Sequence, residues 1–173
     1  MDRIVGTTAP DFKLTACKGD GTSFKEVKLS DYKDKWLVLF FYPLDFTDIW
    51  PTEITGFSER AKEFKDEGAE ILAVSVDSEY SHQVWINGDL GKINFPLASD
   101  ITKKASSDYG VLIEDEGIAL RGLFIINPES IIKYSVIQDN DIGRSVDETL
   151  RVLRALKTGG LCPLDWNIGD DLL

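Results

Sequence analysis

The stretch that decides the fold is Lys35-Trp36-Leu37-Val38-Leu39-Phe40-Phe41-Tyr42, a continuous apolar run that ends at Pro43. It is too short for a buried helix and rich in β-forming residues, so it predicts a central strand covered on both faces. Residues 69–76 form a second run of the same kind. Between the two runs, residues 51–65 carry apolar side chains at helical spacing, and Gly68 marks the end of that helix. Strand, helix and strand predict a right-handed crossover in a partly parallel sheet.

The second half of the chain predicts a hairpin and a closing helix. Residues 120–126 and 130–137 are two strand patterns with so short a connection that they should pair antiparallel. Residues 145–156 form an amphipathic helix pattern with Ser145 as N-cap. Shorter helices are predicted at residues 81–86 and 101–109. We therefore expect one α/β domain over residues 1–173, with a mixed sheet and an extended C-terminal arm over 159–173.

Composition excludes several classes of protein. The chain has 173 residues, with 19 basic against 30 acidic side chains and a formal net charge of −11. Such an acidic surface repels phosphate backbones, so we expect no nucleic-acid partner. The longest apolar run is far too short to cross a bilayer and residues 1–4 do not resemble a secretory signal, so we expect no membrane association and a cytoplasmic location. Two cysteines and one histidine cannot build a four-ligand zinc site or a disulfide framework, and we expect no metal or cofactor.

The segment between the first strand and the first long helix carries the most specific motif. Residues 43–53 read Pro-Leu-Asp-Phe-Thr-Asp-Ile-Trp-Pro-Thr-Glu. This resembles the active-site loop of the typical two-cysteine peroxiredoxins, the group that includes the bacterial alkyl hydroperoxide reductase peroxidase subunit. The family pattern is Pro-x-x-x-Thr-x-x-Cys followed by Pro-Thr-Glu. Other matching motifs are Ala9-Pro10-Asp11-Phe12, Asp77-Ser78, Ser81-His82 with Trp85, Leu120 to Ile126, and Cys162-Pro163 with Trp166. The resemblance implies a thioredoxin-like fold.

The resemblance also implies a role for each residue of the active site. Trp50 stands at the position of the peroxidatic cysteine, and Cys162 stands at that of the resolving cysteine. Pro43 is implied to shield the pocket, and the Thr47 hydroxyl to hydrogen-bond the peroxide oxygens. Without a peroxidatic partner, we expect Cys162 to be a free and idle thiol.

Arg121 is the residue that the resemblance implies would stabilise the reacting thiolate. It lies in an apolar strand, where a buried guanidinium needs a partner, and Glu53 is the expected one. The alternative is an ordinary structural ion pair with no part in a reaction.

Trp50 departs from the family pattern at the position on which the reaction depends. An indole has an N–H donor but no ionisable nucleophile, so it can neither attack a peroxide nor form a disulfide. Asp48 also replaces a residue that is usually aromatic. Because the rest of the motif is intact, we interpret these changes as engineered and expect no peroxidase activity. An indole overpacks a pocket sized for a thiol and a peroxide, and the Asp48 carboxylate resists burial without a partner. We therefore expect Asp48 to Trp50 to lie outside the family's folded pocket, with the first helical turn unwound.

The family's partners follow from the resemblance as well. It implies reduction of hydrogen peroxide and organic hydroperoxides, with electrons from a thioredoxin-like donor or a flavoprotein disulfide reductase. It also implies homodimers that pair through an edge strand near residues 131–136, and rings of dimers. Two other interpretations stay open. The chain could be a non-catalytic, ring-forming scaffold or holdase-like binding protein, or a thioredoxin-fold module that binds another ligand in the pocket.

Two further residues invite a catalytic assignment that their surroundings in the sequence do not favour. Cys17 lies in the turn-rich segment 15–21, which should bend an early hairpin, and we expect a small, half-buried residue there. His82 is a lone helix histidine with no evident paired acid, so we expect a packing or interface residue.

Overall fold

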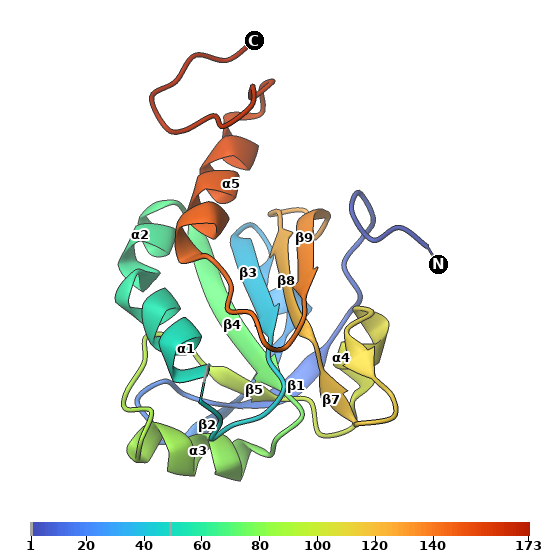
Figure 1. The fold of residues 1–173 in the computed structure, drawn as a ribbon, viewed down its shortest axis with the longest axis vertical. Helices are drawn as coiled ribbons and strands as arrows, with labels where there is room; N and C mark the ends of the chain where they lie inside the picture. The colour runs from blue at the N-terminus through green and yellow to red at the C-terminus, as the bar shows by residue number, and fades with distance from the viewer. Residues whose placement is uncertain (1, 49) are drawn as a thin grey trace.

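A seven-stranded mixed sheet forms the centre of the molecule (Figure 1). The computed structural model describes residues 2–48 and 50–173, with Trp50 described by its backbone alone. In spatial order the strands are β2 (Phe24–Lys28), β1 (Lys13–Cys17), β5 (Leu97–Ser99), β4 (Ala69–Ser75), β3 (Trp36–Phe41), β8 (Arg121–Ile126) and β9 (Ile132–Gln138). A separate small sheet pairs β6 (Leu112–Ile113) with β7 (Ile118–Ala119). The predicted α/β class with a mixed central sheet is confirmed.

The two predicted central strands are β3 and β4, and they pair in parallel from Trp36 opposite Ala69 to Phe41 opposite Val74. β5 extends the parallel part beyond β4, whereas β8 pairs antiparallel with β3 on the other side. β8 and β9 form the antiparallel hairpin that the short connection predicted. This order places the C-terminal end of β3 beside the start of β8, where the candidate site lies.

Helices cover both faces of the sheet. They are α1 (Trp50–Glu59), α2 (Ala61–Asp66), α3 (Glu79–Asn87), α4 (Lys104–Asp108), α5 (Val146–Thr158) and the 3-10 helix η1 (Leu29–Tyr32). We expected a single helix over residues 51–65, and the structure has two, α1 and α2. They are separate because the backbone leaves helical geometry at Arg60, with φ −102° and ψ 6°. Ser145 caps α5 as predicted, since its side chain accepts a hydrogen bond from the Glu148 N–H.

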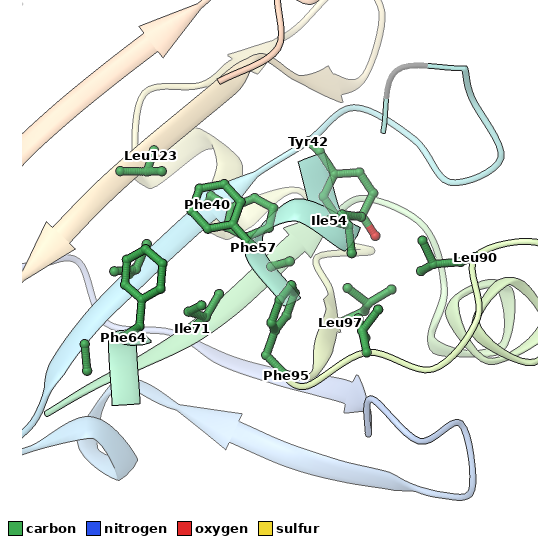
Figure 2. Close-up of a cluster of buried hydrophobic side chains, with 14 of the residues drawn as sticks. Phe40, Tyr42, Ile54, Phe57, Phe64, Ile71, Leu90, Phe95, Leu97 and Leu123 are labelled. Atoms are coloured by element: carbon green, nitrogen blue, oxygen red, sulfur yellow. The ribbon is translucent and has the colours of Figure 1, made fainter. Parts of the chain in front are cut away.

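The apolar run of β3 is continuous because its two faces pack against different clusters. Val38 and Phe40 belong to a cluster with side chains from α1, α2, α3 and α5, whereas Leu37, Leu39 and Phe41 belong to one with side chains from η1 and α4. Figure 2 shows the first cluster, in which Phe40 and the labelled aromatic residues of α1 and α2 lie together. This packing anchors α1 and so determines where its first turn lies.

The start of α1 corrects one sequence-based expectation. The helix begins at Trp50, so its first turn is wound rather than unwound. Pro51 suits a first helical turn, because the N–H that proline lacks has no partner within the helix there. Ile49 and the indole of Trp50 lie outside the described residues. The expected displacement of the indole therefore stays a prediction.

The structure also adds strands at the N-terminal side that the sequence patterns only hinted at. β1 and β2 form the early hairpin, but Cys17 is the last residue of β1 and is fully buried rather than half-buried in a turn. β5 was not predicted, because three residues are too few to show a period.

The C-terminal arm extends from the far end of α5, as Figure 1 shows. Gly159 ends the helix in the left-handed region with φ +68°, where glycine carries no steric penalty. Within the described part of the chain, no helix has the length and apolar character needed to span a membrane.

Candidate active site

A buried carboxylate in the first turn of α1 forms the centre of the candidate site. Glu53 is 5% exposed and lies between two guanidinium groups that come from other parts of the fold. Arg121, at the start of β8, donates a hydrogen bond from Nη1 to Glu53 Oε1. Arg144, just before α5, donates from Nε to Glu53 Oε2 at 2.7 Å and from Nη2 to Oε1 at 3.1 Å. The predicted pairing of Arg121 with Glu53 is therefore present, within a three-residue network.

Arg144 is a site residue that sequence analysis missed. Its Nη1 donates to the carbonyl oxygens of Phe41 at 2.7 Å and Gly122 at 2.8 Å, and its backbone N–H donates to Glu53 Oε2 at 2.7 Å. The guanidinium also lies over the Phe40 ring, 4.9 Å from its centroid. One side chain thus ties together β3, β8, α1 and the start of α5. The only sequence signal for this role of Arg144 is its position directly before the Ser145 N-cap. That signal is weak, because arginine is common at exposed helix ends.

The electrostatics of this network favour a carboxylate at residue 53. Burial alone would raise the pKa of Glu53, but hydrogen bonds from Arg144 and Arg121 and the charge of Arg144 outweigh it, so the pKa lies below its ordinary value. Burial lowers the pKa of both arginines, although a guanidinium stays protonated in proteins. Two cations and one anion leave a net positive charge at the start of α1, where the helix dipole also favours an anion.

The loop between β3 and α1 places the remaining predicted residues. Pro43 is buried directly after β3, and Thr47 is half-buried, with its hydroxyl donating to the Leu44 carbonyl at 3.3 Å. Asp48 is exposed. The structure thus brings Glu53 and Arg121 into contact, and it places Pro43 and Thr47 on the segment that leads to them. The side chain of Trp50 lies outside the described residues.

A second buried network holds this loop from its other side, and sequence analysis missed it. His82 Nδ1 lies 2.7 Å from Asp45 Oδ2, so the histidine has the paired acid that the sequence did not reveal. Tyr42 donates to Asp45 Oδ1 at 2.7 Å, and Ser81 donates to Oδ2 at 2.8 Å. The partners are 37 positions apart, so no local pattern could have joined them. His82 packs inside the fold, fully buried, as one of the two expected alternatives stated.

Cys162 lies far from the start of α1 within one chain. Its half-buried sulfur is 3.6 Å from the Ala155 carbonyl oxygen and 3.6 Å from Thr158 Oγ1, beside the last turns of α5. Glu53 contacts Arg144 at the opposite end of that helix. From Val146 to Ala155 the helix axis rises about 14 Å, far beyond the reach of a disulfide. Within one chain, Cys162 and the Glu53 network therefore lie at opposite ends of α5.

The described residues give no support for a metal centre. Among them, no group of three or more histidine, cysteine, aspartate or glutamate side chains could hold a metal ion. Cys17 is a poor nucleophile, since burial, reinforced by the charge of Asp20, raises its pKa. The chemistry that the geometry favours is stabilisation of negative charge beside Arg121.

Comparisons with known proteins agree with this geometry. The family model described as AhpC/TSA family matches residues 5–135. A putative peroxiredoxin in the rubredoxin operon of Clostridium pasteurianum is 65% identical over 100% of both chains. The mitochondrial thioredoxin-dependent peroxide reductase of Drosophila melanogaster is 54% identical over 92% of this chain and 71% of its own length. The crystal structure of reduced Plasmodium vivax 2-Cys peroxiredoxin has a TM-score of 0.95 at 38% identity, covering 99% of this chain and 93% of that one. The chain therefore belongs to the AhpC/TSA family, in the group of the typical two-cysteine peroxiredoxins.

Proposed function

We propose that this chain is a thiol-peroxidase scaffold that has lost its own peroxidase reaction because Trp50 occupies the peroxidatic position. The observation that carries the proposal is the Glu53–Arg121–Arg144 network, a buried, net positive site at the start of α1. Such a site stabilises a thiolate, and the position that should supply the thiolate holds an indole. The intact surroundings favour an engineered substitution over gradual decay.

The reaction of the family defines what a thiol at this position would do. A thiolate attacks one oxygen of a hydroperoxide, the O–O bond breaks, and the other oxygen leaves with a proton as water or an alcohol. The resulting sulfenic acid condenses with the Cys162 thiol, releasing water and forming a disulfide. A dithiol reductant then restores both thiols. In this scheme Arg121 stabilises the thiolate, Thr47 binds the peroxide, Pro43 shields the pocket, and Glu53 positions Arg121.

The substrates would be hydrogen peroxide and organic hydroperoxides. A thioredoxin-type reductant is supported by the Drosophila relative, whose name states that dependence. A flavoprotein disulfide reductase is the alternative donor. We place the protein in the cytoplasm, in keeping with the expectation from its sequence.

Assembly follows from the distance between the two thiol positions. Because Cys162 lies at the far end of α5, a disulfide with position 50 requires a neighbouring copy. β9 is the last strand of the sheet. Its outer edge is hydrogen-bonded to Gly6 and Thr7 at Ile132, and the part of the edge after Ile132 is the part we propose pairs with a second copy. Phe46, Tyr80 and Val84 are exposed apolar side chains around the loop and α3, and they suit contacts between dimers in a ring.

A peroxide-consumption assay with a thioredoxin system tests the proposal. The chain as it stands should show no turnover, and Trp50→Cys should restore it. Trp50→Ser is the matched control, because it removes the indole without adding a thiol and should stay inactive. Adding Cys162→Ser to the Trp50→Cys chain should allow one turnover without an intersubunit disulfide. Turnover in the unmodified chain, or equal activity of the serine variant, would contradict the assigned mechanism.

A holdase-like scaffold is the second candidate function. The exposed apolar side chains of the arm favour it, with Leu161 70% exposed and Leu164 91% exposed. Suppression of the thermal aggregation of a model client should then be equal in the unmodified chain and in Trp50→Cys. Suppression that is absent from both proteins would remove this candidate.

A further inference from the structure

His82 is the only histidine in the chain, and its buried ring faces a hydrogen-bond acceptor at each nitrogen. Nδ1 lies 2.7 Å from Asp45 Oδ2 in the loop before α1. Nε2 lies 3.0 Å from the carbonyl oxygen of Ala98 in β5. A neutral imidazole can donate from only one nitrogen, so two acceptors favour a ring that carries both protons.

The other hydrogen-bond partners of Asp45 also favour an imidazole that carries a proton on each ring nitrogen. Asp45 Oδ1 accepts from the Tyr42 hydroxyl, and Oδ2 accepts from the Ser81 hydroxyl. Figure 2 shows Tyr42 at the edge of the core cluster, with its hydroxyl directed away from Phe40. An ionised carboxylate only accepts hydrogen bonds, which matches these contacts. The Ala98 carbonyl cannot donate, so Nε2 must carry a proton as well.

A second carboxylate faces the pair and increases the need for a cation. Asp77, after β4, accepts from the Asp45 N–H at 2.8 Å and from the Ser75 hydroxyl at 2.6 Å. Burial, and then the charge of Asp45, raise the pKa of Asp77, while the charge of His82 opposes them. Burial and Asp45 also hold the pKa of Tyr42 well above its ordinary value, so Tyr42 stays neutral. Among the described residues, His82 is the basic side chain that contacts this cluster.

The loop that these contacts hold leads directly into the candidate site. Asp45 is fixed by Tyr42 at the end of β3, by Ser81 and His82 on α3, and by Asp77 after β4. The next residue, Phe46, has φ +61°, in the left-handed region that an aromatic residue rarely adopts. Such a backbone conformation persists where surrounding contacts impose it.

We propose that His82 is a positioning residue whose imidazolium holds Asp45 and thereby sets the path of residues 43–48 into the first turn of α1. The sequence presents His82 as a bystander, and neither the charge network at Glu53 nor the proposed peroxidase reaction requires it. The inference goes beyond the proposed function and does not depend on it, because its tests below measure no peroxidase activity.

The protonation state can be measured directly on the unmodified, tag-free chain. Because it contains one histidine, its NMR spectrum holds a single imidazole, and its ring nitrogens need no mutational assignment. At pH 7 we expect both ring nitrogens to be protonated, with two similar nitrogen shifts. One protonated and one unprotonated nitrogen, with widely separated shifts, would overturn the proposal.

Hydrogen–deuterium exchange of His82→Gln tests the positioning. The amides of residues 44–48 should exchange about tenfold faster than in the unmodified chain, or more. Asp100→Asn is the matched control, because Asp100 is also a buried carboxylate but binds the N–H groups of Ala105 and Ser106. That control should accelerate exchange near α4 and leave residues 44–48 unchanged. Unchanged exchange in His82→Gln, or equal acceleration in the control, would refute the role, and the NMR result stands if the variant does not fold.

Discussion

Two buried charge networks flank the start of α1, and they are built with opposite charge ratios. Glu53 lies between Arg121 and Arg144, so one anion faces two cations. On the other side, Asp45 and Asp77 lie close together, and His82 contacts Asp45. Both networks tie loops and strand ends to helices. They differ in which charge is in excess.

The consequence of that difference appears in the pKa directions. Burial pushes the pKa of every carboxyl group upward, at Glu53 as at Asp77. At Glu53 two guanidinium groups overcome burial and the net shift is downward. At Asp77 burial is reinforced by the neighbouring Asp45, and the net shift is upward. The comparison shows that the excess charge around a buried carboxyl group decides whether its ionisation adds to stability or reduces it.

Glu53→Gln should give the largest effect, because it leaves two buried guanidinium groups without their anion. We expect a loss of about 3–5 kcal/mol in the free energy of unfolding, measured by chemical denaturation. Glu59→Gln is the matched control, since Glu59 is exposed near the end of the same helix and should change stability by less than about 0.5 kcal/mol. Similar losses in the two variants would show that the network does not stabilise the fold.

The free energy of unfolding should depend on pH in the acid range, and part of that dependence should come from Glu53. We call this acid range of the stability profile its acid limb. The pKa of Glu53 is lower in the folded state than its ordinary value of 4.5, so its contribution is fully present above that pH. The contribution is lost as pH falls from there through the folded pKa. Unfolding measured between neutral and acid pH should therefore show a flatter acid limb in Glu53→Gln than in the unmodified chain. An equally steep limb would assign the acid sensitivity to other carboxylates.

Asp77→Asn should have a smaller effect, and in the opposite direction. The folded pKa of Asp77 lies above its ordinary value of 3.8, so ionising it costs stability as pH rises through the folded pKa. Asparagine keeps an oxygen that accepts from the Asp45 N–H and the Ser75 hydroxyl. At neutral pH we expect a change of at most about 1 kcal/mol, toward greater stability, with no such gain at acid pH. A loss as large as that of Glu53→Gln would abolish the contrast between the networks.

Cys162→Ser should be the smallest change, because the thiol lies in the arm, apart from both networks. We expect less than about 0.5 kcal/mol in the free energy of unfolding of the reduced chain. Thiol titration under native conditions should find one accessible thiol in the unmodified chain and none in the variant, since Cys17 is buried. A larger loss of stability would mean that the arm supports the fold.

Sequence analysis predicted most of the framework but only part of the candidate site. The apolar runs of β3 and β4, the spacing in α1 and α5, and the short connection between β8 and β9 each carry a local signal. The pairing of Glu53 with Arg121 could also be predicted, because a guanidinium in an apolar strand requires an anion. Arg144 and His82 could not, since an arginine before a helix and a histidine within one are ordinary surface residues in most proteins.

The sequence by itself determined the central strands β3 and β4, the hairpin of β8 and β9 and the helical character of α1 and α5, and it placed a non-nucleophilic residue at position 50. Those properties depend on local periodicity and on the chemistry of single side chains. Only the tertiary structure decided which charges meet, because Glu53 contacts a residue 91 positions away and Asp45 contacts one 37 positions away. It also decided that Cys162 lies at the opposite end of α5 from Glu53. Contacts between distant segments depend on how the helices pack on the sheet, and no local pattern records that packing.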